Sequence, residues 1–394
     1  MKKNHAKTWT ANLALLLFSA VLCLVFMETM LRQLLNPADY IAPEIVDHDI
    51  LGVQIKPFSA GHDAWGYRNP SVPDFADIVT IGDSQTYGFL SAAQDAWPAH
   101  LATKIKGSVY NLSLPGHSPV DYYYLLTDKA FPLKPSVVIV GFYLGNDLLE
   151  AYRSVYTKAY WKNMRKAGFV PTEDIPPSSV QWVRRNDPRF SGVRGYLAHH
   201  SIIFNIVTPY LLDSIQPLKA KGIGDTPNAV WLQDDTHHIQ TLLTPLQRWI
   251  AINLRDQRVQ EGLRISLDVL RRMNVLCLER GIHLIVALIP TKENVYSDHV
   301  HDLGLAQVNR IREIVLNEEQ VRKTIQSTLR KYQIPSIDLF GPLKEAARTQ
   351  AIYHRRDGHP NREGHQAIAE AIYPYLLKKT SLKHSMPRVG QAQH

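Results

Sequence analysis

Short runs of apolar, mainly β-branched residues constrain the fold of this chain most strongly. Uninterrupted runs of this kind are typical of strands that are buried on both faces, as in a parallel sheet. Helical patterns separate the runs, with apolar residues on one helical face in residues 259–277 and again in 367–376. Alternating strands and helices predict a doubly wound α/β fold. The five expected strands are residues 76–81, 108–112, 136–143, 283–289 and 336–339.

Polar or glycine-containing turns follow the first three of these runs, at Gly82-Asp83-Ser84, Pro115-Gly116 and Gly145-Asn146-Asp147. In a doubly wound sheet, functional residues belong at the carboxyl ends of the strands. A serine on a tight turn exposes its hydroxyl, and the backbone N–H of Ser84 can face a developing oxyanion. A helix-capping serine is an equally ordinary explanation of this turn.

A second candidate motif is Asp357-Gly358-His359, followed by Pro360 and Asn361. A nucleophilic serine needs a base to accept its proton, and that base needs an acceptor that holds its tautomer. Asp357 and His359 supply both from one loop, although a surface turn with one of the 17 histidines is the plainer alternative. Gly116 and Asn146 can each donate a hydrogen bond to an oxyanion. Taken alone, however, each is better explained as an ordinary turn residue. Together these residues predict one catalytic site.

The four motifs resemble the signature blocks of the SGNH (GDSL) hydrolase superfamily. The resemblance implies a flavodoxin-like, five-stranded parallel sheet, with Ser84 as nucleophile, Asp357 and His359 as the rest of the triad, and Ser84, Gly116 and Asn146 as the oxyanion hole. It covers roughly residues 76–147 and 283–378. More narrowly, the chain is similar to membrane-anchored SGNH proteins of bacterial surface-polysaccharide systems, including the alginate acetylation type. The turns at residues 66–69 and 289–292 favour that similarity.

These residues predict an acyl-ester hydrolase or acyltransferase that works through an acyl-enzyme on O-acetyl groups of a cell-surface polysaccharide. The expected partners are an acylated carbohydrate or other ester and the membrane, without a metal or organic cofactor. A non-catalytic glycan-binding or scaffold subunit is the alternative, although such a module has no need of all four blocks. The choice between hydrolase and transferase stays open, because both use the same intermediate.

The N-terminus predicts a single-pass inner-membrane protein with its catalytic domain on the periplasmic side. Lys2, Lys3 and Lys7 precede an apolar stretch, and basic residues in this position hold the N-terminus in the cytoplasm. We expect a basic tip at residues 1–10 and an uncleaved signal anchor at 11–35. A cleaved signal peptide is the alternative, but small residues are lacking after Met27. Bulky residues before Cys23 argue against lipid attachment there.

The expected domain organisation continues with an extended linker at residues 36–75 and an SGNH domain at 76–378. Residues 148–255 and 292–330 do not follow the strand–helix rhythm and are interpreted as insertions. The polar tail at 379–394 is expected to be disordered.

Composition excludes several other classes of protein. The formal net charge of +8 suits anionic lipids or acidic polymers, but no basic helix or zinc spacing supports nucleic-acid binding. Two cysteines, Cys23 and Cys277, cannot form a disulfide framework. Three further candidates each have a plainer alternative. Residues 234–238 are possible metal ligands or a solvated loop, and Tyr122, Tyr123 and Tyr124 are possible sugar-stacking or packing residues. A glycan-binding face or a solvated basic face is possible at Trp161, Lys162, Arg165 and Lys166.

Overall fold

The computed structural model describes residues 2–171, 192–215, 225–226, 229–237, 239–300 and 303–379. Residues 380–394 of the expected tail, the Pro/Ser loop at 176–177 and His238 lie outside this description.

A five-stranded parallel sheet forms the centre of the domain, with the strand order β10-β9-β5-β3-β4. In chain order this is the 2-1-3-4-5 arrangement of flavodoxin-like folds, so the predicted fold class is confirmed. The connection reverses direction between β3 and β5, and ligands of such sheets bind beyond the strand ends at that point. The strands are β3 (Ile78–Gly82), β4 (Val109–Ser113), β5 (Val137–Tyr143), β9 (His283–Ile289) and β10 (Ser336–Asp338).

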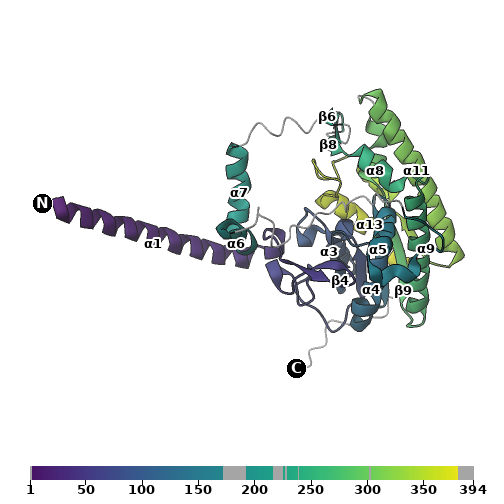
Figure 1. The fold of residues 1–394 in the computed structure, drawn as a ribbon, viewed down its shortest axis with the longest axis horizontal. Helices are drawn as coiled ribbons and strands as arrows, with labels where there is room; N and C mark the ends of the chain where they lie inside the picture. Colours follow the sequence, from purple (N-terminus) through teal and green to yellow (C-terminus); the bar gives the residue numbers. More distant parts are fainter. Residues whose placement is uncertain are drawn as a thin grey trace, which may run out of the picture.

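Helices cover both faces of this sheet (Figure 1). Side chains alternate between the two faces along each strand, so every strand contributes to two cores. In β5, Val138 and Val140 join one core, whereas Val137 and Ile139 join the other. The first core packs on α4 (Pro119–Leu125), α5 (Asp147–Thr157) and α9 (Gln257–Leu278), and the second on α3 (Trp97–Ile105), α12 (Phe340–Ala346) and α13 (Arg362–Lys379).

The remaining elements border this three-layer centre. Two strands form a hairpin before the sheet and three form a second antiparallel sheet. The strands are β1 (Ile45–His48), β2 (Gly52–Ile55), β6 (Asp225–Thr226), β7 (Ala229–Asp234) and β8 (Ile239–Leu243). The helices are α1 (Lys2–Leu34), α2 (Ser84–Tyr87), α6 (Gly192–His200), α7 (Ile202–Ile215), α8 (Pro245–Ile252), α10 (Lys292–Val295) and α11 (Leu305–Lys331).

Two expected segments, the first insertion and the linker, pack more closely into the domain than the sequence indicated. Residue 148, the expected start of the first insertion, falls inside α5, where Leu148 and Tyr152 are fully buried in the first core. The expected linker at 36–75 holds the β1–β2 hairpin and packs on the domain through the buried Ile55 and Tyr67. Both segments therefore contribute to the folded body.

Helix α1 extends away from the domain (Figure 1). Its residues Trp9–Leu34 are long and apolar enough to cross a bilayer, a property that a membrane anchor and a signal sequence share. The Glu28 carboxylate accepts hydrogen bonds from the backbone N–H groups of Ile202 and Ile203, at 3.0 and 3.1 Å. These bonds attach the end of α1 to the first turn of α7.

Candidate active site

Ser84 lies where β3 passes into the short helix α2, and its side chain is buried. The Asp83 carboxylate caps this helix by accepting a hydrogen bond from the Gln85 backbone N–H at 2.9 Å. A Cβ atom at Gly82 would come within 2.3 Å of Thr86 Oγ1, so only glycine fits before the turn. The local sequence therefore places the Ser84 hydroxyl at the carboxyl end of the central strands.

His359 reaches Ser84 from the other end of the chain. Its Nε2 atom lies 2.7 Å from Ser84 Oγ, and its Nδ1 atom contacts Asp357 Oδ1. An ionised carboxylate only accepts hydrogen bonds, so Nδ1 carries the proton and Nε2 is free to accept the Ser84 hydroxyl proton. The structure thus brings together the three residues expected for a triad.

Asp357 stays ionised in this arrangement. Burial on its own would raise the pKa of Asp357, but the hydrogen bonds and charge of His359, together with the charge of Arg248, outweigh it and lower the pKa to about 2. The backbone N–H of His359 also donates to Asp357 Oδ1 at 2.9 Å. The loop is closed at its base by a bridge between Tyr353 and Pro360. Both side chains are therefore held in one orientation.

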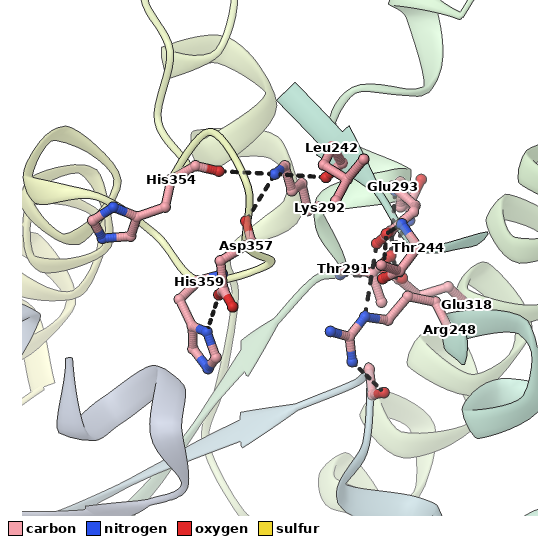
Figure 2. Close-up of polar contacts among 12 residues, drawn as sticks. Leu242, Thr244, Arg248, Thr291, Lys292, Glu293, Glu318, His354, Asp357 and His359 are labelled. Carbon is pink, nitrogen blue, oxygen red and sulfur yellow. Dashed lines mark hydrogen bonds and ion pairs between the residues drawn. The ribbon is translucent and has the colours of Figure 1, made fainter. Parts of the chain in front are cut away.

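Lys292, the first residue of α10, holds this loop by its backbone carbonyls (Figure 2). Its fully buried ammonium donates to the carbonyl oxygens of Leu242, His354 and Asp357 at 2.9, 3.0 and 2.8 Å. Burial lowers the pKa of Lys292 to about 8. The sequence marked this turn only as part of a family resemblance, and gave no sign that its lysine would bind the triad loop.

Asn146 follows β5 and its side chain faces Asp83. Asn146 Nδ2 donates one of its two amide hydrogens to Asp83 Oδ2 at 3.1 Å. Burial raises the pKa of Asp83, while the hydrogen bonds that it accepts and the charge of His359 act in the opposite direction. The next residue, Asp147, accepts from the Tyr122 hydroxyl at 2.8 Å and the Tyr143 N–H at 2.9 Å. This network fixes the strand end that carries Asn146.

Gly116 lies in the turn after β4, with a φ of 82° that favours glycine. Because β4 pairs with β3 in parallel, this turn and Ser84 share one edge of the sheet. Ser84, Gly116 and Asn146 therefore follow three adjacent strands, as the sequence predicted.

Arg248 of α8 is a site residue that the sequence did not indicate. Its Nη1 atom donates to the Gly145 carbonyl at 3.2 Å, and its Nη2 atom lies 3.0 Å from the position that a Cβ at Gly358 would take. Its Nε atom is 3.9 Å from a carboxylate oxygen of Glu293. This guanidinium connects the Asn146 turn to the triad loop.

The other sequence candidates occupy different places. Tyr122 is buried, so packing explains it better than sugar stacking, and Trp161 is also buried and is not part of an exposed glycan-binding face. Lys162, Arg165 and Lys166 are exposed. Asp234 contacts both His237 and His299, and none of these three residues belongs to the triad.

Residues 250–390 match the family model described as "SGNH hydrolase-like domain, acetyltransferase AlgX". This part of the chain is similar to SGNH hydrolase-like domains. The predicted resemblance is thereby confirmed. The matched residues include Asp357 and His359 but begin after Ser84, Gly116 and Asn146. No curated protein matches the chain in sequence.

Several solved structures are similar to the chain. A lipolytic protein of the G-D-S-L family from Desulfitobacterium hafniense has 14% identity and a TM-score of 0.36, over 75% of this chain and 97% of that one. A GDSL-like lipase from Bacteroides thetaiotaomicron has 10% identity and a TM-score of 0.35, over 77% and 88%. An acetylxylan esterase from Geobacillus stearothermophilus has 11% identity and a TM-score of 0.36, over 76% and 93%.

Proposed function

We propose that this protein is a serine-dependent acyl-ester hydrolase or acyltransferase that works through an acyl-enzyme on Ser84. The observation that carries the proposal is the continuous contact from Ser84 Oγ to His359 Nε2, at 2.7 Å, and from His359 Nδ1 to the Asp357 carboxylate. Such an arrangement activates a serine hydroxyl that is otherwise a weak nucleophile.

The first half of the reaction acylates Ser84. Ser84 Oγ attacks the ester carbonyl carbon while His359 Nε2 accepts the hydroxyl proton, and Asp357 stabilises the imidazolium. The tetrahedral intermediate collapses, the bond to the alcohol oxygen breaks, and His359 returns its proton to that oxygen. In the second half, water or a sugar hydroxyl attacks the acyl-enzyme by the same steps. These steps call on no metal or organic cofactor.

The negative charge of the intermediate would be stabilised by the backbone N–H groups of Ser84 and Gly116 and by the Asn146 amide. Asp83 supports this role of Asn146, because a carboxylate at 3.1 Å turns the NH2 end of the amide, and not its oxygen, toward the site. Donors that are already oriented cost no reorganisation as the charge develops, and each is worth about 3 kcal/mol.

The proposed substrate is an O-acetyl group on a cell-surface polysaccharide, and the proposed location is the periplasmic side of the inner membrane. The family description, which names an acetyltransferase, supports an acetyl donor or product. The basic residues in the first turns of α1 and the length of this helix support an anchored domain outside the cytoplasm. The net charge of +8 suits an acidic polymer.

Intact-protein mass spectrometry after brief exposure to 4-nitrophenyl acetate tests this function. The wild-type protein should gain the mass of one acetyl group, and peptide mapping should place it on Ser84. Ser84→Ala should gain none, and an acidic glycan acceptor should discharge the adduct faster than water if the enzyme is a transferase. A folded wild-type protein that never acquires the adduct would instead favour the non-catalytic glycan-binding alternative.

A further inference from the structure

Three potential metal ligands converge away from the triad. Asp234 ends β7, His237 follows in the turn to β8, and His299 belongs to the short 3-10 helix Ser297–His299. Asp234 Oδ2 lies 2.9 Å from His237 Nδ1 and 2.8 Å from His299 Nδ1. All three ligand atoms lie within 4.8 Å of one another. Segments more than 60 residues apart in sequence thus present a single set of donor atoms.

One carboxylate and two imidazoles are a donor set typical of zinc and similar transition metals. With bonds of about 2.0–2.1 Å, the donor atoms of a tetrahedral site stand roughly 3.3 Å apart. Each of the two Asp234–histidine pairs, at 2.8 and 2.9 Å, therefore needs to separate by only about half an ångström around an ion.

The cluster borders a cavity of about 890 Å³, which Asp235, Thr236 and Asp298 help to line. The side chains of His299 and Asp234 are only 10% and 18% exposed, whereas His237 is 39% exposed. Two ligands are thus held by the protein and the third lies on the open side. Three protein ligands beside an open space leave a fourth coordination position for water or a small ligand.

We propose that Asp234, His237 and His299 bind one divalent transition-metal ion of the zinc class. Asp234 supplies a carboxylate oxygen and each histidine its Nδ1 atom, as neutral imidazole. The proposal is independent of the chemistry at Ser84, because neither the triad nor its oxyanion donors belong to this cluster.

Such an ion would attach the β7–β8 hairpin to the segment after α10. β8 in turn bonds to the triad loop, since the Leu242 N–H donates to the Arg355 carbonyl at 2.7 Å. Thr241 Oγ1 donates to the same carbonyl at 3.1 Å. The metal would therefore have a structural role. It would stabilise the β7–β8 hairpin, and β8 in turn contacts the loop that carries His359.

The test uses the full chain in detergent micelles, without a polyhistidine tag and stripped of metal by a chelator. Zn²⁺ is titrated in competition with a chromophoric chelator, and Co²⁺ is titrated as a spectroscopic probe. We expect one equivalent of Zn²⁺ to bind and to raise the melting temperature. Co²⁺ should give the intense visible bands of a tetrahedral site.

Asp234→Asn, His299→Ala and His237→Ala should each weaken Zn²⁺ binding at least tenfold and abolish the Co²⁺ bands. His237→Ala is the variant most certain to fold, because its side chain is the most exposed of the three. His283→Ala, an exposed histidine at the start of β9, is the matched control and should bind as the wild type does. Equal binding by all the variants, or none by the wild type, would overturn the proposal and leave a metal-free carboxylate–imidazole cluster.

Discussion

Lys292 Nζ donates a hydrogen bond to the carbonyl oxygen of Asp357 at 2.8 Å, across 65 residues of sequence. The same ammonium binds the carbonyl oxygens of Leu242 and His354, so its three hydrogens have three acceptors. The carboxylate of Asp357 contacts His359 on the opposite side of the loop (Figure 2). A buried lysine on α10 therefore fixes the backbone from which the acid and base of the triad project.

The protonation of Lys292 predicts a decline in activity above neutral pH. As the pH rises through about 8, the group loses one of its three hydrogens and one carbonyl loses its donor. We expect kcat/KM to fall by roughly three- to tenfold, the scale of one hydrogen bond. Stopped-flow or steady-state rates from pH 6 to 10 measure this fall in kcat/KM. The Lys292→Met variant should have lower activity throughout and should not show the fall above neutral pH.

The free energy of unfolding should behave differently over the same pH range. The folded-state pKa of about 8 lies below the ordinary 10.5 of lysine, so the unfolded chain binds more protons between these values. This residue therefore makes stability rise with pH in that window. A loss of activity that simply follows global unfolding would contradict the assignment.

Asn146→Ala should lower kcat by roughly 100- to 1000-fold, the usual effect of removing one oxyanion donor. KM should change far less, because the donor serves the transition state and not the bound ester. Steady-state kinetics on a small acetyl ester separate the two constants. An effect confined to KM would make Asn146 a substrate-binding residue.

Asp83→Asn tests how Asn146 is oriented. The new amide oxygen can still cap α2 by accepting from the Gln85 N–H, so the melting temperature should change little. Its NH2 group would then face Asn146, which must turn its own oxygen toward Asp83's position and its donor away from the site. We expect kcat to fall about 100-fold. Activity within about tenfold of wild type would show that Asp83 does not orient the donor.

The topology of α1 predicts that a phosphatase reporter fused after residue 378 is active outside the cytoplasm. The mature protein should keep its N-terminus, because no small-residue site follows Met27. N-terminal sequencing of the membrane fraction measures this. A soluble form beginning near residue 30 would replace the anchor with a cleaved signal.

The expected insertion shows that a break in the alternation of strand and helix patterns does not always mark a separate segment. Residues 148–255 interrupt the strand–helix alternation, yet this range contributes α5 to the core and α8 to the site. The β8 strand in this range bonds to the triad loop through Leu242. Removing the whole range would therefore take away Arg248 and the support of Asp357 together with any acceptor-binding surface.

The sequence alone determined the strands, the fold class and the residues that follow β3, β4 and β5. Apolar runs and turns are local patterns, and parallel strands necessarily bring their carboxyl ends to one edge. Only the tertiary structure decided that Lys292 holds the triad loop, that Arg248 bonds to the Gly145 carbonyl, and that His299 joins Asp234. These relationships join backbone carbonyls and side chains from segments far apart in the chain. A hydrogen bond to a backbone carbonyl leaves no signature in the residue that accepts it, and a contact between distant segments follows no local pattern, so the sequence did not reveal them.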